Sequence, residues 1–130
     1  LSLVQLIKVT GAVIVTTPQK VALSVAQKGL QFFKQAGINV PILGLIENMA
    51  YFTPAELPDN KYYLFGKDGG KELAKKYFIP FLGEVPLVQA IREAGDEGKP
   101  IAAQEVPVAK AFQEIASTLA QRIAIVNSNL

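Results

Sequence analysis

The chain has 130 residues, of which 50% are apolar and 18% charged, and thirteen Lys and Arg stand against eleven Asp and Glu. These proportions predict one modest globular domain rather than a disordered or fibrous chain. Cysteine and histidine are absent from the sequence, which excludes thiol nucleophiles, disulfides, Cys/His zinc sites and Ser-His or Cys-His catalytic pairs made from this chain.

Charge patterning and the amino-terminal stretch limit the partners. Lysine and arginine form no long basic run, so we expect no nucleic-acid partner. Residues 1–10 resemble no signal peptide, and no apolar run approaches the roughly 20 residues of a membrane span. We therefore expect no membrane contact and a cytoplasmic location, with which the lack of cysteine agrees. A first residue Leu rather than Met is typical of an internal segment.

Short apolar runs alternate with helical patterns, which is typical of βαβ units and a parallel sheet. Residues 12–16, rich in valine and isoleucine, predict a first strand buried on both faces. Thr17 and Pro18 then provide an N-cap and a proline at the first helical position, so a helix is predicted to begin there and to end near Gly37. Residues 40–46 predict the second buried strand.

Residues 50–66 interrupt this alternation with prolines, aromatic residues and an Asp59-Asn60 turn signal. They predict a long loop with a small hairpin, and long ordered loops are often functional. Its aromatic side chains could form a stacking platform, but without interleaved arginine we favour an anchor on the domain or on a partner. These aromatic residues are Tyr51, Phe52, Tyr62, Tyr63 and Phe65.

The alternation resumes after the loop. Residues 68–78 predict a short helix and residues 80–85 a third strand. A short helix over 88–94 is followed by a turn-rich break at 95–100. The last helix is predicted over 106–126, because its apolar residues recur at steps of three and four.

A glycine-rich string at 66–72 superficially resembles a phosphate-binding P-loop but has the wrong spacing. Gly66 and Gly70 are separated by three residues where that loop has four, and Lys71 is followed by Glu72 rather than by Ser or Thr. We interpret the string as a glycine-rich start of a helix. Anion binding at that helix N-terminus is the alternative.

Polar residues follow the first two strands, at the edge of a parallel sheet where α/β proteins bind ligands. Thr17 follows the first strand, and Glu47 and Asn48 follow the second. The carboxamide of Asn48 carries a donor and an acceptor, which suits the edge of an adenine ring. Taken alone, Thr17 is also explained as an N-cap, Asn48 as a turn residue, and residues 85–87 as an ordinary strand end.

Four segments in this order resemble the carboxy-terminal half of the Mrp/ApbC family. They are VTTPQ at 15–19, GLIENMAYF at 44–52, FLGEVPL at 81–87 and AIREAGDEGKPI at 90–101. The resemblance spans nearly the whole chain. It implies the α/β fold class, with a mostly parallel P-loop NTPase sheet flanked by helices.

The family consists of MinD-like, deviant-Walker P-loop ATPases that carry an iron–sulfur cluster at a dimer interface and deliver it to apo-protein clients. The resemblance implies that residues 1–130 are the C-terminal portion of one such domain, with 50–66 as an inserted loop or hairpin. The Walker A half would precede the chain. The intact protein would bind ATP and Mg²⁺, hydrolyse ATP and form a homodimer, and its role would be iron–sulfur cluster carriage or assembly. The fragment alone would be inactive.

The resemblance also assigns site residues. Asn48 matches the asparagine that the family uses to bind adenine. The segment that lines the purine is matched by Val85, Pro86 and Leu87. No catalytic residue and no metal ligand is assigned to this chain.

The cluster ligands of the family are not matched. Its Cys-x-x-Cys motif follows an aromatic pair, here Tyr51 and Phe52, and alignment on that pair places Pro54 and Leu57 where the cysteines stand. A bridged cluster requires thiolates from each subunit. We therefore do not expect an iron–sulfur cluster to be bound through this segment.

A second function class stays open, that of a non-enzymatic α/β module whose loop at 50–66 and long last helix bind a protein partner. The prolines and aromatic residues of the loop favour it, as does the lack of a complete catalytic set. A flavodoxin-like phosphate or flavin binder is weaker, because no phosphate loop follows the first strand.

Overall fold

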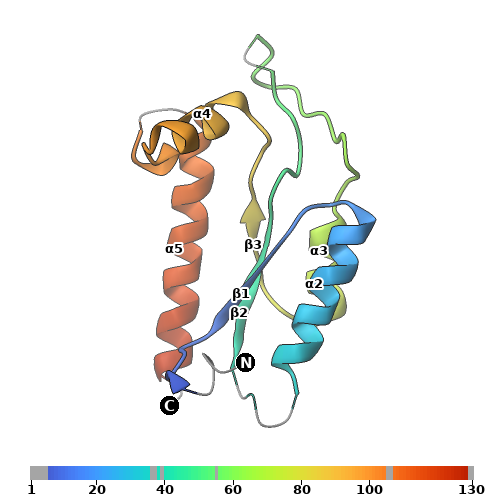
Figure 1. Ribbon diagram of the computed structural model, residues 1–130, viewed down its shortest axis with the longest axis vertical. Helices are drawn as coiled ribbons and strands as arrows, with labels where there is room; N and C mark the ends of the chain where they lie inside the picture. Colours follow the sequence, from blue (N-terminus) through green and yellow to red (C-terminus); the bar gives the residue numbers. More distant parts are fainter. Residues whose placement is uncertain (1–5, 36–37, 39, 55, 105–106, 129–130) are drawn as a thin grey trace.

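The computed structural model describes residues 6–35, 38, 40–54, 56–104 and 107–128. Its three strands are parallel and lie in the order β1-β2-β3, so the predicted α/β class is confirmed (Figure 1). The elements in chain order are β1 (Ala12–Thr16), α2 (Lys20–Phe33), β2 (Ile42–Glu47), α3 (Gly69–Lys76), β3 (Phe81–Glu84), α4 (Gln89–Glu97), the short 3-10 helix η1 (Ile101–Ala103) and α5 (Pro107–Ser128).

The sheet is the middle of three layers. Helices α2 and α3 pack on one face, and α5 packs on the other (Figure 1). Leu30, Leu45 and Leu73 fill the first interface, while Leu82 and Ile115 fill the second. Burying both faces explains why the strands are continuous apolar runs without polar alternation.

The prediction for the first strand matches the observed bounds, whereas the predicted start of the following helix is wrong. Helix α2 begins at Lys20, and its N-cap residue is Gln19 rather than Thr17. The carbonyl of Gln19 accepts the Leu23 N–H at 3.0 Å, while the Thr17 hydroxyl donates to the Gln19 side chain at 3.1 Å. The expected helix end at Gly37 lies outside the described residues.

Other boundaries differ by small amounts. The predicted strands at 40–46 and 80–85 are observed at 42–47 and 81–84. Helix α4 continues to Glu97, because Gly98 with φ of 71° supplies the left-handed C-cap that ends it. The first residue predicted for the last helix, Val106, lies outside the described residues, and α5 continues to Ser128.

Residues between β2 and α3 form a long loop with one antiparallel contact. Phe52 and Tyr62 exchange backbone hydrogen bonds of 2.7 and 2.8 Å. This loop and α4 both extend beyond the carboxyl ends of the strands (Figure 1). Among the residues that the structure describes, no helix has the length and apolarity needed to cross a bilayer.

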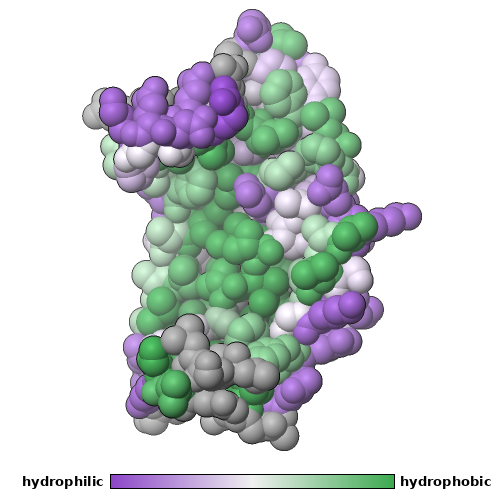
Figure 2. All heavy atoms as spheres, in the orientation of Figure 1, coloured by the Kyte–Doolittle hydropathy of each residue, from purple (hydrophilic) through white to green (hydrophobic). Residues whose placement is uncertain are grey.

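Strand β1 is an edge strand of the described sheet, and an apolar surface surrounds it. Figure 2 shows hydrophobic side chains gathered over β1 between α5 and α2. Val15 of β1 is 61% exposed, and Val21 of α2 is 79% exposed. Val25, one turn further along α2, is exposed as well. A contiguous apolar surface of this kind is typical of an interface.

Candidate functional site

The carboxyl end of the sheet holds a network of backbone hydrogen bonds that continues past the strands. The Val85 N–H donates to the Glu47 carbonyl at 2.8 Å, and the Ala50 N–H donates to the Val85 carbonyl at 3.0 Å. The Leu87 N–H then donates to the Tyr51 carbonyl at 2.7 Å. The segments after β2 and β3 therefore stay side by side beyond the ends of the strands.

Asn48 lies within this network and is held from two sides. Its N–H donates to the Thr16 carbonyl of β1 at 2.7 Å, and its side-chain Oδ1 accepts the Met49 N–H at 2.9 Å. Met49 has φ of 54°, which is uncommon for a residue other than glycine. Because Oδ1 is held, the exposed carboxamide has a defined orientation.

The predicted site residues come together at this edge, although their side chains differ in exposure. Asn48 and Leu87 are exposed, and Pro86 is buried. Val85 is buried against Leu82 and Ile115, so its side chain belongs to the core. At this edge Val85 can act only through its backbone, whereas Leu87 presents an apolar side chain.

The sequence placed Glu47 at this edge but did not predict that its side chain is the most buried polar one there. Only 1% of Glu47 is exposed, and its Oε2 accepts the Gly70 N–H at 2.5 Å. Burial raises the pKa of Glu47 above its ordinary value, the Gly70 hydrogen bond acts against this, and the nearby Glu84 charge raises the pKa further. One signal was available, because Glu47 has the same strand parity as buried Leu45.

Glu47 also takes the place of a local cap on α3. The N-cap residue of α3 is Asp68, which has φ of 60° and makes no side-chain cap hydrogen bond within the described chain. A carboxylate near a helix N-terminus is stabilised by the free N–H groups and the helix dipole. A Cβ on Gly70 would lie 2.8 Å from Glu47 Oε2, so glycine is required for this close approach.

The glycine string at 66–72 has the structural role that we expected. It leads into α3 and packs against the segment after β1, where the Pro18 carbonyl would lie 3.4 Å from a Cβ on Gly66 or Gly69. Together with the Glu47 contact, this packing fixes the start of α3 against the ends of both β1 and β2.

The aromatic residues of the loop pair with lysines. The rings of Tyr51 and Tyr63 lie 6.1 Å apart, with Lys61 Nζ 4.6 Å from the first ring and Lys67 Nζ 5.1 Å from the second. Cation–π contacts of this kind stabilise exposed sites by about 0.5–1 kcal/mol. Exposed apolar side chains of the same loop are Leu57, Tyr62 and Leu64.

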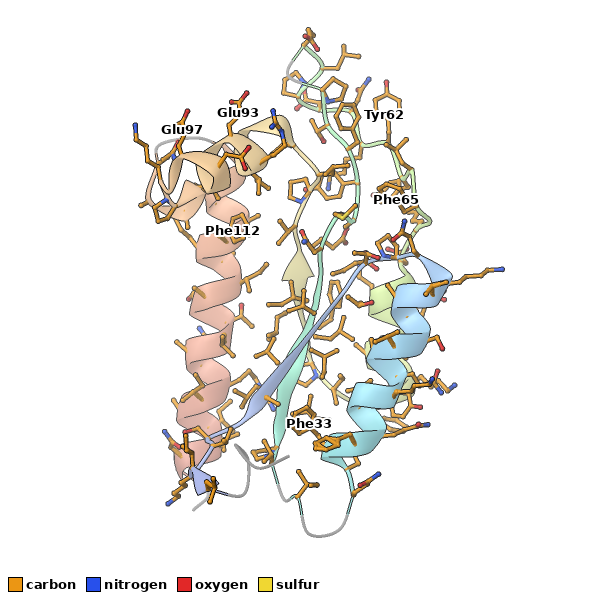
Figure 3. The ribbon with its side chains drawn as sticks, viewed as in Figure 1. Phe33, Tyr62, Phe65, Glu93, Glu97 and Phe112 are labelled. Carbon is orange, nitrogen blue, oxygen red and sulfur yellow. The ribbon has the colours of Figure 1, made fainter. Side chains whose placement is uncertain are left out.

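Aromatic side chains of the loop and acidic side chains of α4 lie at the same end of the molecule. Figure 3 shows Tyr62 and Phe65 on the loop, at the same end as Glu93 and Glu97 of α4, whereas Phe33 lies at the opposite end. In the described ranges no three Asp, Glu, Cys or His residues are placed to hold a metal ion. The chain has no cysteine or histidine, so its residues do not fit the ligand set of an iron–sulfur cluster.

The two positions where the resemblance places cysteines are joined by a backbone hydrogen bond. The Leu57 N–H donates to the Pro54 carbonyl at 3.1 Å, and neither side chain can ligate iron. This end of the sheet thus presents polar and apolar side chains, and the described residues form no metal centre.

Comparison with known proteins identifies the family. The family "ParA: NUBPL iron-transfer P-loop NTPase" matches residues 1–120. The chain belongs to this family. The match confirms the resemblance to iron–sulfur carrier ATPases of the Mrp/ApbC type. A curated relative, the iron–sulfur cluster carrier protein of Synechocystis sp., is 47% identical over 127 residues. That alignment covers 96% of this chain and 35% of the relative, so the chain spans about a third of its length.

Solved structures agree with the family. A nucleotide-binding protein from Archaeoglobus fulgidus, in complex with ADP, has a TM-score of 0.60 at 38% identity, covering 69% of this chain and 36% of that one. The cell division ATPase MinD of Pyrococcus furiosus has a TM-score of 0.62 at 26% identity, covering 86% of this chain and 43% of that one. The P-loop NTPase fold that we expected is therefore confirmed.

Proposed function

We propose that this chain is the carboxy-terminal part of an ATP-binding P-loop NTPase of the iron–sulfur carrier type, and that it contributes the adenine-recognition edge. The observation that carries the proposal is the backbone hydrogen-bond network at the carboxyl end of the sheet. In it Glu47 and Ala50, on either side of Asn48, both pair with Val85. The relative from Archaeoglobus fulgidus, solved with ADP, supports a nucleotide as the ligand.

The chemistry of the edge suits adenine. The Asn48 amide group donates to a ring nitrogen, and its Oδ1 accepts from the exocyclic amine, which is the pairing that asparagine makes with adenine. Leu87 supplies an apolar side chain for the ring face, and its N–H bond to the Tyr51 carbonyl fixes its backbone. Guanine carries a carbonyl where adenine carries the amine, so a good pair discriminates by about 1–3 kcal/mol.

The phosphate chemistry belongs to a preceding part of the protein. We propose that a Walker A half, which would bind the ATP phosphates and Mg²⁺, pairs with the exposed edge of β1 and covers Val15 and Val21. The share of the Synechocystis relative that the chain spans supports this. The intact protein would then hydrolyse ATP through positioning and charge stabilisation.

The family also supports a proposal for the cellular role. We propose a cytoplasmic homodimer that serves iron–sulfur apo-protein clients, as the name of the Synechocystis carrier supports. The cluster is the cargo in this proposal. Its thiolate ligands would have to come from outside residues 1–130, because these contain no cysteine.

The test compares the full-length protein with its Asn48→Ala variant, using calorimetric titration of ATP and GTP. We expect the variant to lose about tenfold in ATP affinity, equivalent to one hydrogen bond to a base, and to lose the preference for ATP. An unchanged ratio of the two Kd values would contradict the assignment. ATP turnover of about 1 s⁻¹ by the 130-residue chain with Mg²⁺ would contradict the proposal that the catalytic groups lie outside this chain.

A second function is favoured by the loop between β2 and α3, which exposes Leu57, Tyr62 and Leu64. In that case the chain is a non-enzymatic module that binds a protein partner through these side chains. The reading frame upstream of Leu1 separates the two functions. A GxGGxGKS-type loop there favours the ATPase, and a start codon directly before residue 1 favours the module.

A further inference from the structure

Glu47 lies where three segments of the carboxyl edge meet. Its backbone carbonyl accepts the Val85 N–H after β3, and its carboxylate accepts the Gly70 N–H in the first turn of α3. The next residue, Asn48, donates to the Thr16 carbonyl of β1. One residue therefore contacts the end of β3 and the start of α3, and adjoins the proposed base contact.

We propose that Glu47 is a positioning residue for base recognition. Its side chain closes the β2–α3 loop against the sheet and thereby holds Asn48 in the orientation that meets adenine. This inference rests on the proposed function of Asn48, and it adds a residue that touches no nucleotide.

The shape of the loop explains why a hydrogen bond between Glu47 and Gly70 is needed to hold its two ends together. The chain leaves the sheet at Asn48, is joined to itself by the Phe52 and Tyr62 pair, and returns at Gly70. Since Asp68 provides no side-chain cap among the described contacts, the carboxylate of Glu47 takes the Gly70 N–H that a local cap would take, and it adds to the glycine packing that holds the returning end. The close packing of Gly70 on the carboxylate leaves no room for the returning end to shift inward.

The conformation of Met49 shows how the Glu47 contact affects the carboxamide of Asn48. Met49 adopts a left-handed conformation, and its N–H holds Asn48 Oδ1. A non-glycine residue keeps such a conformation only where its surroundings impose it. Glu47 lies directly before this turn, with its side chain buried and its carbonyl bonded to β3. Loss of its side chain would free the turn from one side.

The experiment uses the full-length protein and separates the effect of the length of the Glu47 side chain from the effect of its charge. Glu47→Gln keeps the length and an acceptor for Gly70, whereas Glu47→Asp keeps the charge but is one methylene shorter. Glu47→Ala removes both. The matched control is Glu72→Ala, which removes an exposed carboxylate from the same first turn of α3. ATP and GTP affinities are measured by calorimetric titration.

We expect Glu47→Ala to lose about tenfold in ATP affinity and to lose the ATP preference, while Glu47→Gln stays within about twofold. Glu47→Asp should lose as much ATP affinity and preference as Glu47→Ala. It replaces the alanine variant in the test if that variant does not fold. The double variant with Asn48→Ala should bind ATP no more weakly than Asn48→Ala alone. Additive losses, or an intact preference in Glu47→Asp, would overturn the proposal.

A second measurement decides the matter without nucleotide. Hydrogen exchange of the Met49 amide reports its bond to Asn48 Oδ1. We expect faster exchange in Glu47→Asp and unchanged exchange in Glu72→Ala. If Asn48→Ala leaves the ATP preference intact, the proposed function fails, but the positioning role is still tested here. Unchanged Met49 exchange in Glu47→Asp shows that Glu47 does not position the turn.

Discussion

Glu47 at the end of β2 stands opposite Glu84 at the end of β3 in the register of the sheet. Burial raises the pKa of Glu47 above its ordinary value of 4.5, and the Glu84 charge adds to this. The folded state therefore binds the proton more tightly than the unfolded state. The stability that this proton contributes is present in full below about pH 4.5 and is lost as the pH rises through the folded-state pKa.

Glu47→Gln should reduce this pH dependence, because glutamine keeps the acceptor for the Gly70 N–H but does not ionise. Urea midpoints of the protein at about pH 4 and about pH 8 measure the change. The variant should gain most, relative to the parent protein, at the higher pH. Glu72→Gln, at an exposed position in the first turn of α3, is the control that should keep the parent's dependence.

Gly70→Ala should destabilise the protein, because the added Cβ would lie 2.8 Å from Glu47 Oε2. Overpacking of this kind costs about 1–3 kcal/mol. Denaturant unfolding measures the loss. Combining it with Glu47→Ala should cost less than the sum of the two changes, because the clashing carboxylate is then absent. Gly95→Ala, where no atom outside the surrounding helix backbone lies within 4 Å of the new Cβ, is the matched control.

Phe78→Gly should stabilise the protein. Phe78 has φ of 56° and is 94% exposed, so the side chain gains little from packing. A left-handed conformation costs a residue with a Cβ roughly 1–2 kcal/mol, and the extra flexibility of glycine in the unfolded chain offsets part of this. Thermal unfolding should show a higher midpoint. Phe78→Ala keeps the conformational cost, so a gain of equal size there would attribute the effect to exposure.

Val15→Lys tests whether the edge of β1 is covered by another part of the full-length protein. In the 130-residue chain the position is 61% exposed, and a surface substitution should change stability by within about 0.5 kcal/mol. In the full-length protein we expect a loss above about 2 kcal/mol, because the lysine would be buried without a partner. Equal effects on both proteins would argue against a preceding half that covers this edge.

The sequence predicted the features that depend on local pattern. The run at 12–16 has the observed strand bounds, since a strand buried on both faces needs only apolar, β-branched residues. The cap signal of Thr17 and Pro18 was misleading, because Pro18 is buried and packs against the glycines before α3. A contact between distant segments overrode a local preference there.

The candidate site was predicted only where it follows from strand ends. The proximity of Asn48 to the segment 85–87 follows from parallel topology, because successive strand ends meet at one edge. The role of Glu47 does not follow in this way. Its burial depends on Gly70, 23 residues away, whose return to the sheet is set by the fold of the loop. Strand-end position alone placed Glu47 at the edge beside Asn48 and gave its carboxylate no partner.

The edge of β1 also has a practical consequence for work with the isolated chain. No strand of the described residues lies on its outer side, and Val15 and Val21 flank it. An apolar strand edge is a template on which other chains add by backbone pairing. Preparations of these residues alone should therefore self-associate with rising concentration, and a lysine placed on that edge is a direct means of keeping them monomeric.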